Sequence, residues 1–313
     1  MEDKNIKGHA SLLVAYIIFG INTPVSKAIM DHGEVNAGAL TFFRIGGAAL
    51  LFWTISLFTK KENPPLRDLI MMFVASLFGI LLNQAPFIVG LSLTSPINAS
   101  VIVSVMPVIT MILAAFFLKE PITWKKAIGV FVGASGALLL IFSGNMSNHR
   151  DGSLAGNLLC LLSTCAFAVY LSAFKKVIVK YSPITFMKWM FLFASTYCLP
   201  FYWNDITTVD YASIPDDIYL RILYVIVCAT FVSYLLIPIG QKKLRPTIVS
   251  MYNYLQPITS SLVAVGLGMD RFGWLKGSAT ALVFIGVYIV TKSKSYAQMK
   301  AENPDKYPDR EGD

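Results

Sequence analysis

The chain has 313 residues, of which 55% are apolar and only 14% are charged. Soluble domains carry about 25% charged residues, so this composition excludes an ordinary soluble globular protein. The formal net charge of +8 does not indicate a nucleic-acid partner, because the basic residues are spread over short segments between apolar runs instead of gathering on one face.

Apolar runs of membrane-spanning length follow one another along most of the chain. Crossing the hydrocarbon core takes about 20 mostly apolar residues. The first run continues past any small-residue cleavage site after its leading lysines, which predicts that it is retained as a span. We therefore predict an all-α membrane protein embedded in the lipid bilayer. Its ten transmembrane helices are expected at residues 9–30, 38–58, 68–92, 96–118, 124–142, 153–174, 183–203, 218–240, 246–268 and 272–292.

The lysines and arginines between the spans are distributed unevenly. With ten spans the two termini share a side, and the termini together with the segments on their side hold 19 basic residues. The segments on the opposite side hold only 2, Arg150 and Arg271. An excess of Lys and Arg marks cytoplasmic loops. The sequence therefore predicts a multi-pass protein of the cytoplasmic (inner or plasma) membrane, with both termini in the cytoplasm.

The second half of the chain repeats the first. Residues 90–140 align without a gap on residues 240–290. Because a five-span unit has an odd number of spans, its second copy must lie inverted relative to the first. We predict two inverted five-helix repeats, at 1–148 and 149–292, and a polar cytoplasmic tail at 293–313. The identical pairs are Gly90/Gly240, Pro96/Pro246, Ser100/Ser250, Pro107/Pro257, Ala114/Ala264, Trp124/Trp274, Lys126/Lys276 and Gly136/Gly286.

The recurring prolines suggest a role for the repeat. Inverted repeats occur in secondary transporters, where the substrate binds between the halves near the middle of the membrane and access alternates by rocking. Pro107 and Pro257 are predicted near mid-span, where freed backbone carbonyls can line a polar cavity. Pro24 in the first span is a third candidate for a kink or gate. The alternative is that these prolines only kink packed helices.

Several short motifs carry a family resemblance. The stretch "FGINTPVSK" contributes Phe19, Gly20, Asn22 and Lys27, "TFFRIGGAAL" contributes Arg44, and a later run contributes Pro107, Glu120, Gly129 and Gly136. Through them the sequence resembles the drug/metabolite transporter superfamily, and within it the ten-span EamA family, over residues 9–292. Phe19 replaces the usual tryptophan, and Asp270 replaces the usual glutamate of the second copy. The resemblance implies export or import of small metabolites such as amino acids.

Charged side chains within the spans are functional candidates, because they are costly in lipid. All aspartates, glutamates and histidines fall in loops, tails or span ends, so no mid-membrane proton carrier is predicted. Lys27 is expected near the outer end of its span, and Arg44 about 9 Å inside the next. Arg44 could orient a substrate carboxylate. The alternative is that Lys27 and Lys188 reach the headgroups, and that Arg44 has no role in binding. A cavity with cations and no carboxylates favours anionic or zwitterionic solutes.

Polar residues of the ninth span form a second group of candidates. Asn253, Gln256 and Ser260 share one helix face, with Tyr252 beside them, whereas their counterparts in the fourth span are mostly apolar: Val103, Met106, Thr110 and Ile102. This face could line a ligand pocket or hydrogen-bond to another helix. Weaker candidates for substrate binding are Asn22, Gln84 with its neighbour Asn83, Tyr170 and Tyr234. Gly129 and Gly133 predict close helix packing, while Glu120 and Asp270 are expected to be structural.

Together these features predict a secondary transporter that moves an amino acid, a related zwitterion or an organic anion, in the direction of export. The runner-up is a multidrug-type exporter of hydrophobic cations, and a non-transporting scaffold is a third possibility. An enzyme is not expected, because no histidine or carboxylate cluster lies at depth. No cofactor and no metal are expected, since the four cysteines lack metal-binding spacing. The protein is expected to act as a monomer or homodimer.

Overall fold

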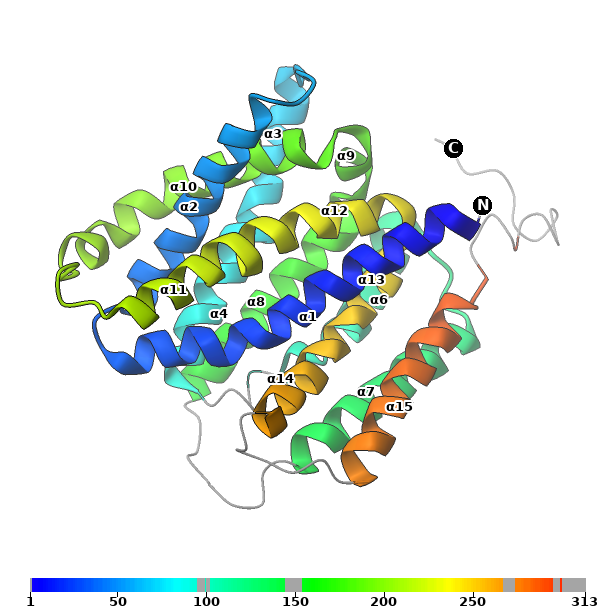
Figure 1. The fold of residues 1–313 in the computed structure, drawn as a ribbon. Coiled ribbons are helices and arrows are strands. Elements are labelled where there is room, and N and C mark those ends of the chain that lie inside the picture. Colours follow the sequence, from blue (N-terminus) through cyan, green and yellow to red (C-terminus); the bar gives the residue numbers. More distant parts are fainter. Residues whose placement is uncertain are drawn as a thin grey trace.

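A computed structural model describes residues 2–94, 102–143, 154–266 and 274–294, with the single positions 99 and 299. Every regular element in these ranges is helical (Figure 1). The first half contains α1 (Glu2–His32), α2 (Ala37–Ser56), α3 (Leu66–Ser76), the π-helix η1 (Leu77–Leu81), α4 (Leu82–Leu93), α6 (Met106–Leu118) and α7 (Trp124–Ser143). The second half contains α8 (Leu154–Ala173), α9 (Lys175–Lys180), α10 (Pro183–Thr207), α11 (Asp216–Tyr224), the π-helix η2 (Val225–Val232), α12 (Ser233–Lys243), α13 (Pro246–Met251), the 3-10 helix η3 (Tyr252–Tyr254), α14 (Leu255–Gly266) and α15 (Trp274–Thr291).

The helices expose apolar side chains and bury polar ones, as expected in lipid. Leu50 and Phe116, for example, are 73% and 77% exposed, whereas Asn22 and Gln84 are buried. Within the described residues, five helices or helix combinations are long and apolar enough to cross a membrane, at Ile6–His32, Ala37–Ser56, Leu66–Leu93, Leu154–Ala173 and Asp216–Lys243. Met106–Leu118 and Ala281–Val290 are shorter apolar helices. The number of ten spans therefore stays a prediction.

Three of the predicted spans are divided by a π-helix or a 3-10 helix. The span expected at 68–92 consists of α3, η1 and α4, the one at 218–240 of α11, η2 and α12, and the one at 246–268 of α13, η3 and α14. In η2 the hydroxyl of Thr230 donates to the carbonyl of Val225 at 2.7 Å, five residues back. Both π-helices are followed by a helix with an internal proline, Pro86 in α4 and Pro238 in α12. π-Helical turns inside α-helices are frequent at functional sites.

Helices at equivalent places in the two halves pack against each other. α2 lies along α10, and α7 lies along α15 (Figure 1). Near one end of the first pair Asn36 donates to Asp205 at 2.7 Å, and near the other end Phe52 stacks on Phe191. Residue numbers rise along α2 as they fall along α10, so these equivalent helices run antiparallel.

The other contacts between the halves come in matching pairs. α1 packs against α12 and α14, while its counterpart α8 packs against α4 and α6. If every helix is replaced by its counterpart in the other half, the contacts of α1 with α12 and α14 become the contacts of α8 with α4 and α6. The core between the halves is aromatic, with Phe191 and Phe19 both against the ring of Tyr234, at centroid distances of 5.3 and 5.9 Å. This packing fixes Tyr234 at the centre of the molecule.

Candidate functional site

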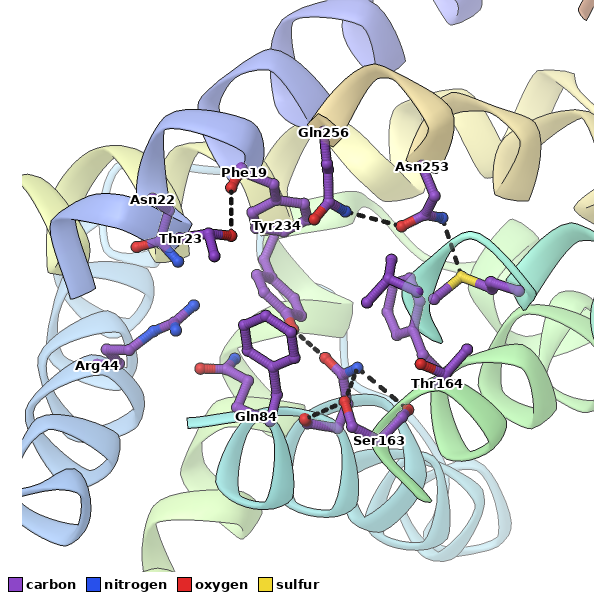
Figure 2. Close-up of a pocket in the computed structure, with 15 residues that line it drawn as sticks. Phe19, Asn22, Thr23, Arg44, Gln84, Ser163, Thr164, Tyr234, Asn253 and Gln256 are labelled. Carbon is purple, nitrogen blue, oxygen red and sulfur yellow. Dashed lines mark hydrogen bonds between the residues drawn. The ribbon is translucent and has the colours of Figure 1, made fainter. Parts of the chain in front are cut away.

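A small pocket with a cavity volume of ≈ 60 Å³ lies where the two halves meet. Many of its lining residues lie in the middle parts of the predicted spans, where a membrane-spanning segment is farthest from water. Figure 2 shows its polar side chains converging from opposite sides. The first half contributes Phe19, Asn22, Thr23, Arg44, Asn83, Gln84, Phe87, Val103 and Met106, and the second half Ser163, Thr164, Phe167, Tyr234, Asn253 and Gln256.

Arg44 forms one end of the pocket. Its side chain is only 3% exposed, and its Nε donates to the hydroxyl oxygen of Thr230 at 3.2 Å. Because that hydroxyl donates to Val225 in η2, its lone pair is aimed at the arginine. No hydrogen bond or ion pair with another described residue occupies the two terminal guanidinium nitrogens. Figure 2 shows them directed into the pocket, between Asn22 and Gln84.

A hydrogen-bond network on α4 and α8 forms the floor beside Arg44. The hydroxyl of Tyr234 donates to Asn83 Oδ1 at 2.9 Å, and Asn83 Nδ2 donates to Ser163 Oγ at 3.2 Å. Ser163 in turn donates to the backbone carbonyl of Asn83 at 2.6 Å. Gln84 differs from these residues, because both polar atoms of its amide are buried without a hydrogen-bond partner within the described ranges. Tyr234 lies beside Gln84, but its hydroxyl hydrogen is given to Asn83.

The opposite end of the pocket is formed at a break in the ninth predicted span. The 3-10 helix η3 separates α13 from α14 there, and Pro257 lies in the first turn of α14. Asn253 donates to the carbonyl of Ser250 at 3.0 Å and to the sulfur of Met106 at 2.9 Å, and Gln256 donates to Asn253 Oδ1 at 2.8 Å. This break holds both amide side chains against the pocket.

The fourth predicted span is interrupted at the matching place. Ser104 and Val105 form a turn, α6 begins at Met106, and Pro107 lies in its first turn. Pro107 was expected near the middle of its span, and the structure places it at the break, in the first turn of α6. Its missing N–H costs little there. Val103 and Met106, the apolar counterparts of Asn253 and Gln256, line the pocket as well.

Four predicted binding residues lie away from the pocket lining or outside the described part. Lys27 donates to the carbonyls of Leu91 and Ser92, both at 3.3 Å, and pairs with Asp31. These contacts tie α1 to the end of α4. The hydroxyl of Tyr170 donates to Gln241 at 3.3 Å. The side chain of Ser260 lies outside the described part of the chain.

Tyr252 also points away from the pocket lining. Its hydroxyl lies 2.6 Å from His9 Nδ1, and its ring stacks on Tyr16. Pro24 lies inside α1, one residue after the pocket residue Thr23. The structure does bring together seven predicted residues around the pocket: Asn22, Arg44, Asn83, Gln84, Tyr234, Asn253 and Gln256.

Sequence reasoning did not select the remaining lining residues. Phe19 and Phe167 recur at related places in the two halves, and this recurrence was the available signal for them. Ser163 and Thr164 are small polar residues within an apolar helix, a pattern that is also common in helix packing. Thr23 and Phe87 carried no signal in the sequence.

Comparison with known proteins agrees with this architecture. The EamA-like transporter family matches the chain twice, over residues 6–142 and 154–292. "Uncharacterized transporter YyaM" of Bacillus subtilis (strain 168) is 23% identical, over 83% of this chain and 87% of its own. "Uncharacterized inner membrane transporter YicL" of Salmonella typhimurium is 23% identical, over 91% of this chain and 95% of its own. A crystal structure superposes with a TM-score of 0.71 at 17% identity, over 93% of this chain and 98% of that one, and so shares the fold. The two matches cover nearly the whole chain, and the protein belongs to the EamA-like transporter family.

Proposed function

We propose that this integral membrane protein is a secondary transporter that carries a small metabolite across the cytoplasmic membrane by alternating access. The observation that carries the proposal is the polar pocket between the halves, with walls from both. A site at the interface of two repeats is exposed to one side of the membrane or the other when the halves rock against each other. Interrupted helices border it at η1, η2 and η3.

The proposal includes ten spans in two inverted repeats, with both termini in the cytoplasm. The antiparallel packing of α2 against α10 supports inversion, because these helices occupy the same place in the two halves. The matching contacts of α1 with α12 and of α8 with α4 support it as well. The excess of lysine and arginine on one side supports the orientation.

The proposed substrate is an amino acid, a related zwitterion or an organic anion. Arg44 supports this class, because it is a buried guanidinium with no carboxylate partner among the described residues, and such a group attracts negative charge. We propose export as the direction. Lys175 and Arg245 lie near the Glu120–Lys126 ion pair on the predicted cytoplasmic side, and the positive charge that remains there would concentrate anions at that face.

The first test is the thermal unfolding of the purified protein in detergent with amino acids, small organic acids and hydrophobic cations. A ligand that binds only the folded state raises the unfolding temperature. Stabilisation by an amino acid or organic acid supports the proposal, and flux of that compound into and out of proteoliposomes then decides the direction. Asn253→Ala and Gln256→Ala should reduce this flux while the proteins still insert into the membrane. Stabilisation by hydrophobic cations alone would favour a multidrug-type exporter.

A further inference from the structure

Arg44 is a buried charge without a protein counter-charge among the described residues. Buried ions are costly unless they are paired, and arginine stays protonated in proteins. The hydroxyl oxygen of Thr230 accepts a hydrogen bond from Nε of Arg44 alone, and this bond orients the guanidinium group. The two terminal nitrogens, which form the fork that binds a carboxylate through two parallel hydrogen bonds, are left to face the pocket (Figure 2).

Gln84 adds an independent observation at the same end of the pocket. Its amide is 3% exposed, and neither its nitrogen nor its oxygen has a hydrogen-bond partner within the described ranges. A buried polar group without a partner carries a desolvation cost that a bound ligand can remove. The amide nitrogen can donate a further hydrogen bond to an anion held by Arg44.

We propose that Arg44 and Gln84 form a carboxylate subsite, and that the substrates are organic acids without an ammonium group beside the carboxylate, in preference to α-amino acids. The inference rests on the proposed function and narrows its substrate class.

The exclusion of the ammonium group follows from the charges around the subsite. The α-ammonium of an amino acid lies within about 4 Å of its own carboxylate. When Arg44 binds the carboxylate, the ammonium is therefore held close to the guanidinium. Two like charges held close together repel strongly in a buried site. The described lining residues include no carboxylate to offset it. The nearby side-chain oxygens of Asn22 and Asn83 already accept hydrogen bonds, from Ser26 and Tyr234. The free oxygen of Gln84 is neutral and cannot balance a full charge.

The rest of the pocket suits the uncharged part of such a molecule. Phe19, Phe87 and Phe167 provide apolar surface, and Asn253 and Gln256 lie toward the opposite end (Figure 2). Amides can hydrogen-bond to a hydroxyl or carbonyl group, and they add no charge. The pocket thus combines a cationic end, which binds an anion, with a neutral end.

Matched probes that differ only in the charged groups test this inference. Three acids, acetate, propionate and 3-phenylpropionate, are compared with glycine, alanine and phenylalanine, and 3-phenylpropionate also with phenethylamine. Affinities come from the concentration dependence of the unfolding temperature at constant ionic strength. At least one acid should bind about 10-fold or more tightly than its amino acid.

The outcomes separate this inference from the proposed function. An amino acid that binds as well as its acid overturns the inference and leaves the proposed transporter in place. Binding of phenethylamine alone contradicts both. If none of the six carboxylates binds at millimolar concentration while other ligands of the screen do, the subsite is absent.

The variant Arg44→Gln distinguishes a ligand-binding arginine from a structural one. It should weaken binding of the acid about 100-fold, because it removes the charge and the fork. It should also leave the unfolding temperature of the ligand-free protein unchanged or raised, because an unpaired buried charge is removed. A structural arginine would give the opposite result, a lowered unfolding temperature of the ligand-free protein.

Lys188→Gln is the matched control. This lysine lies outside the pocket, with its ammonium 5.0 Å from the ring centroid of Trp53, so its loss should not change acid binding.

Discussion

At the scale of single residues, Glu120 and Lys126 form a buried ion pair. Lys126 is 1% exposed and donates to Glu120 at 2.5 Å, and Thr247 of the second half donates to the same carboxylate at 3.5 Å. The left-handed conformation of Lys119, with φ of 51°, ends α6 just before Glu120. The pair therefore joins the end of α6 to the start of α7, and both to α13.

Breaking this pair should destabilise the protein. Glu120→Gln leaves the ammonium of Lys126 buried without a counter-charge, so we expect a loss of about 3–5 kcal/mol. Lys126→Met combined with Glu120→Gln should recover much of this loss, because no charge remains. Thermal unfolding in detergent measures all three proteins, and a double variant that is no more stable than Glu120→Gln would contradict the explanation.

Glu62 gives the stability a dependence on pH. It lies in the loop before α3, where it accepts hydrogen bonds from the backbone N–H and the hydroxyl of Ser182, the residue that caps α10, at 3.0 and 2.7 Å. Partial burial raises the pKa of this carboxyl, but the hydrogen bonds from Thr185 and Ser182 outweigh it and hold the pKa below the ordinary 4.5. The carboxylate therefore stabilises the folded state above pH 4.5.

We expect Glu62→Gln to lower the stability at pH 7 by about 1 kcal/mol or less. The difference from the unchanged protein should shrink as the pH falls below 4.5, and it should vanish below the folded-state pKa, where both side chains are neutral. Unfolding temperatures of the two proteins between pH 7 and pH 3 measure this, with Asp210→Asn in an exposed outer loop as a control. A difference that does not change with pH would mean that the charge of Glu62 is not responsible.

At the scale of elements, α7 and α15 pack through glycines, which confirms the close packing predicted from Gly129 and Gly133. A Cβ atom added at Gly286 would lie 2.5 Å from the backbone nitrogen of Gly133, and one added at Gly129 would lie 2.9 Å from the carbonyl oxygen of Gly286. Side chains this small let helices approach closely in a membrane.

Gly286→Ala should therefore push α15 away from α7. We expect a loss of about 1–3 kcal/mol, because the clash is with backbone that cannot move alone. Gly46→Ala in α2 is a matched control: the nearest atom to its added Cβ is in the side chain of Phe42, at 3.3 Å. Comparable losses in the two variants would show that helix approach is not the cause.

The sequence predicted most helices, because a helix that crosses a lipid bilayer is a long run of apolar residues, and such runs can be recognised in the sequence. The shared prolines of the fourth and ninth spans were expected beside a polar cavity, and the residues directly before them, Met106 and Gln256, line the pocket. The sequence did not predict η1, η2 or η3. These turns differ from an α-helix in the spacing of their backbone hydrogen bonds, and this spacing cannot be inferred from the residue types. Tyr252 illustrates the consequence: it was expected beside Gln256 on the polar face, but the 3-10 turn of η3 directs it to His9. Thr230, which orients Arg44, could not be found without knowing that α2 packs against η2.

At the scale of the whole molecule, the proposed topology places the α2–α3 loop in the cytoplasm and the α10–α11 loop outside. We expect a membrane-impermeant maleimide to label Thr208→Cys on intact cells, because this exposed residue lies in the outer loop. Lys61→Cys, also exposed, should react only after the cells are permeabilised. The unchanged protein is the control, since its cysteines are buried or half-buried within helices. Labelling of both variants, or of Lys61→Cys alone, in intact cells would contradict the topology.

The matching positions of the two π-helices in the two halves bear on how the chain evolved. Shifted by the 150 positions that relate the halves, residues 77–81 fall on 227–231, inside η2. One irregular turn acquired before a gene duplication accounts for both more simply than two separate events at matching sites. If each half has the five inverted spans proposed above, the ancestor was a five-helix protein. Such a protein forms a two-sided pocket of this kind as a pair of identical subunits that enter the membrane in opposite directions.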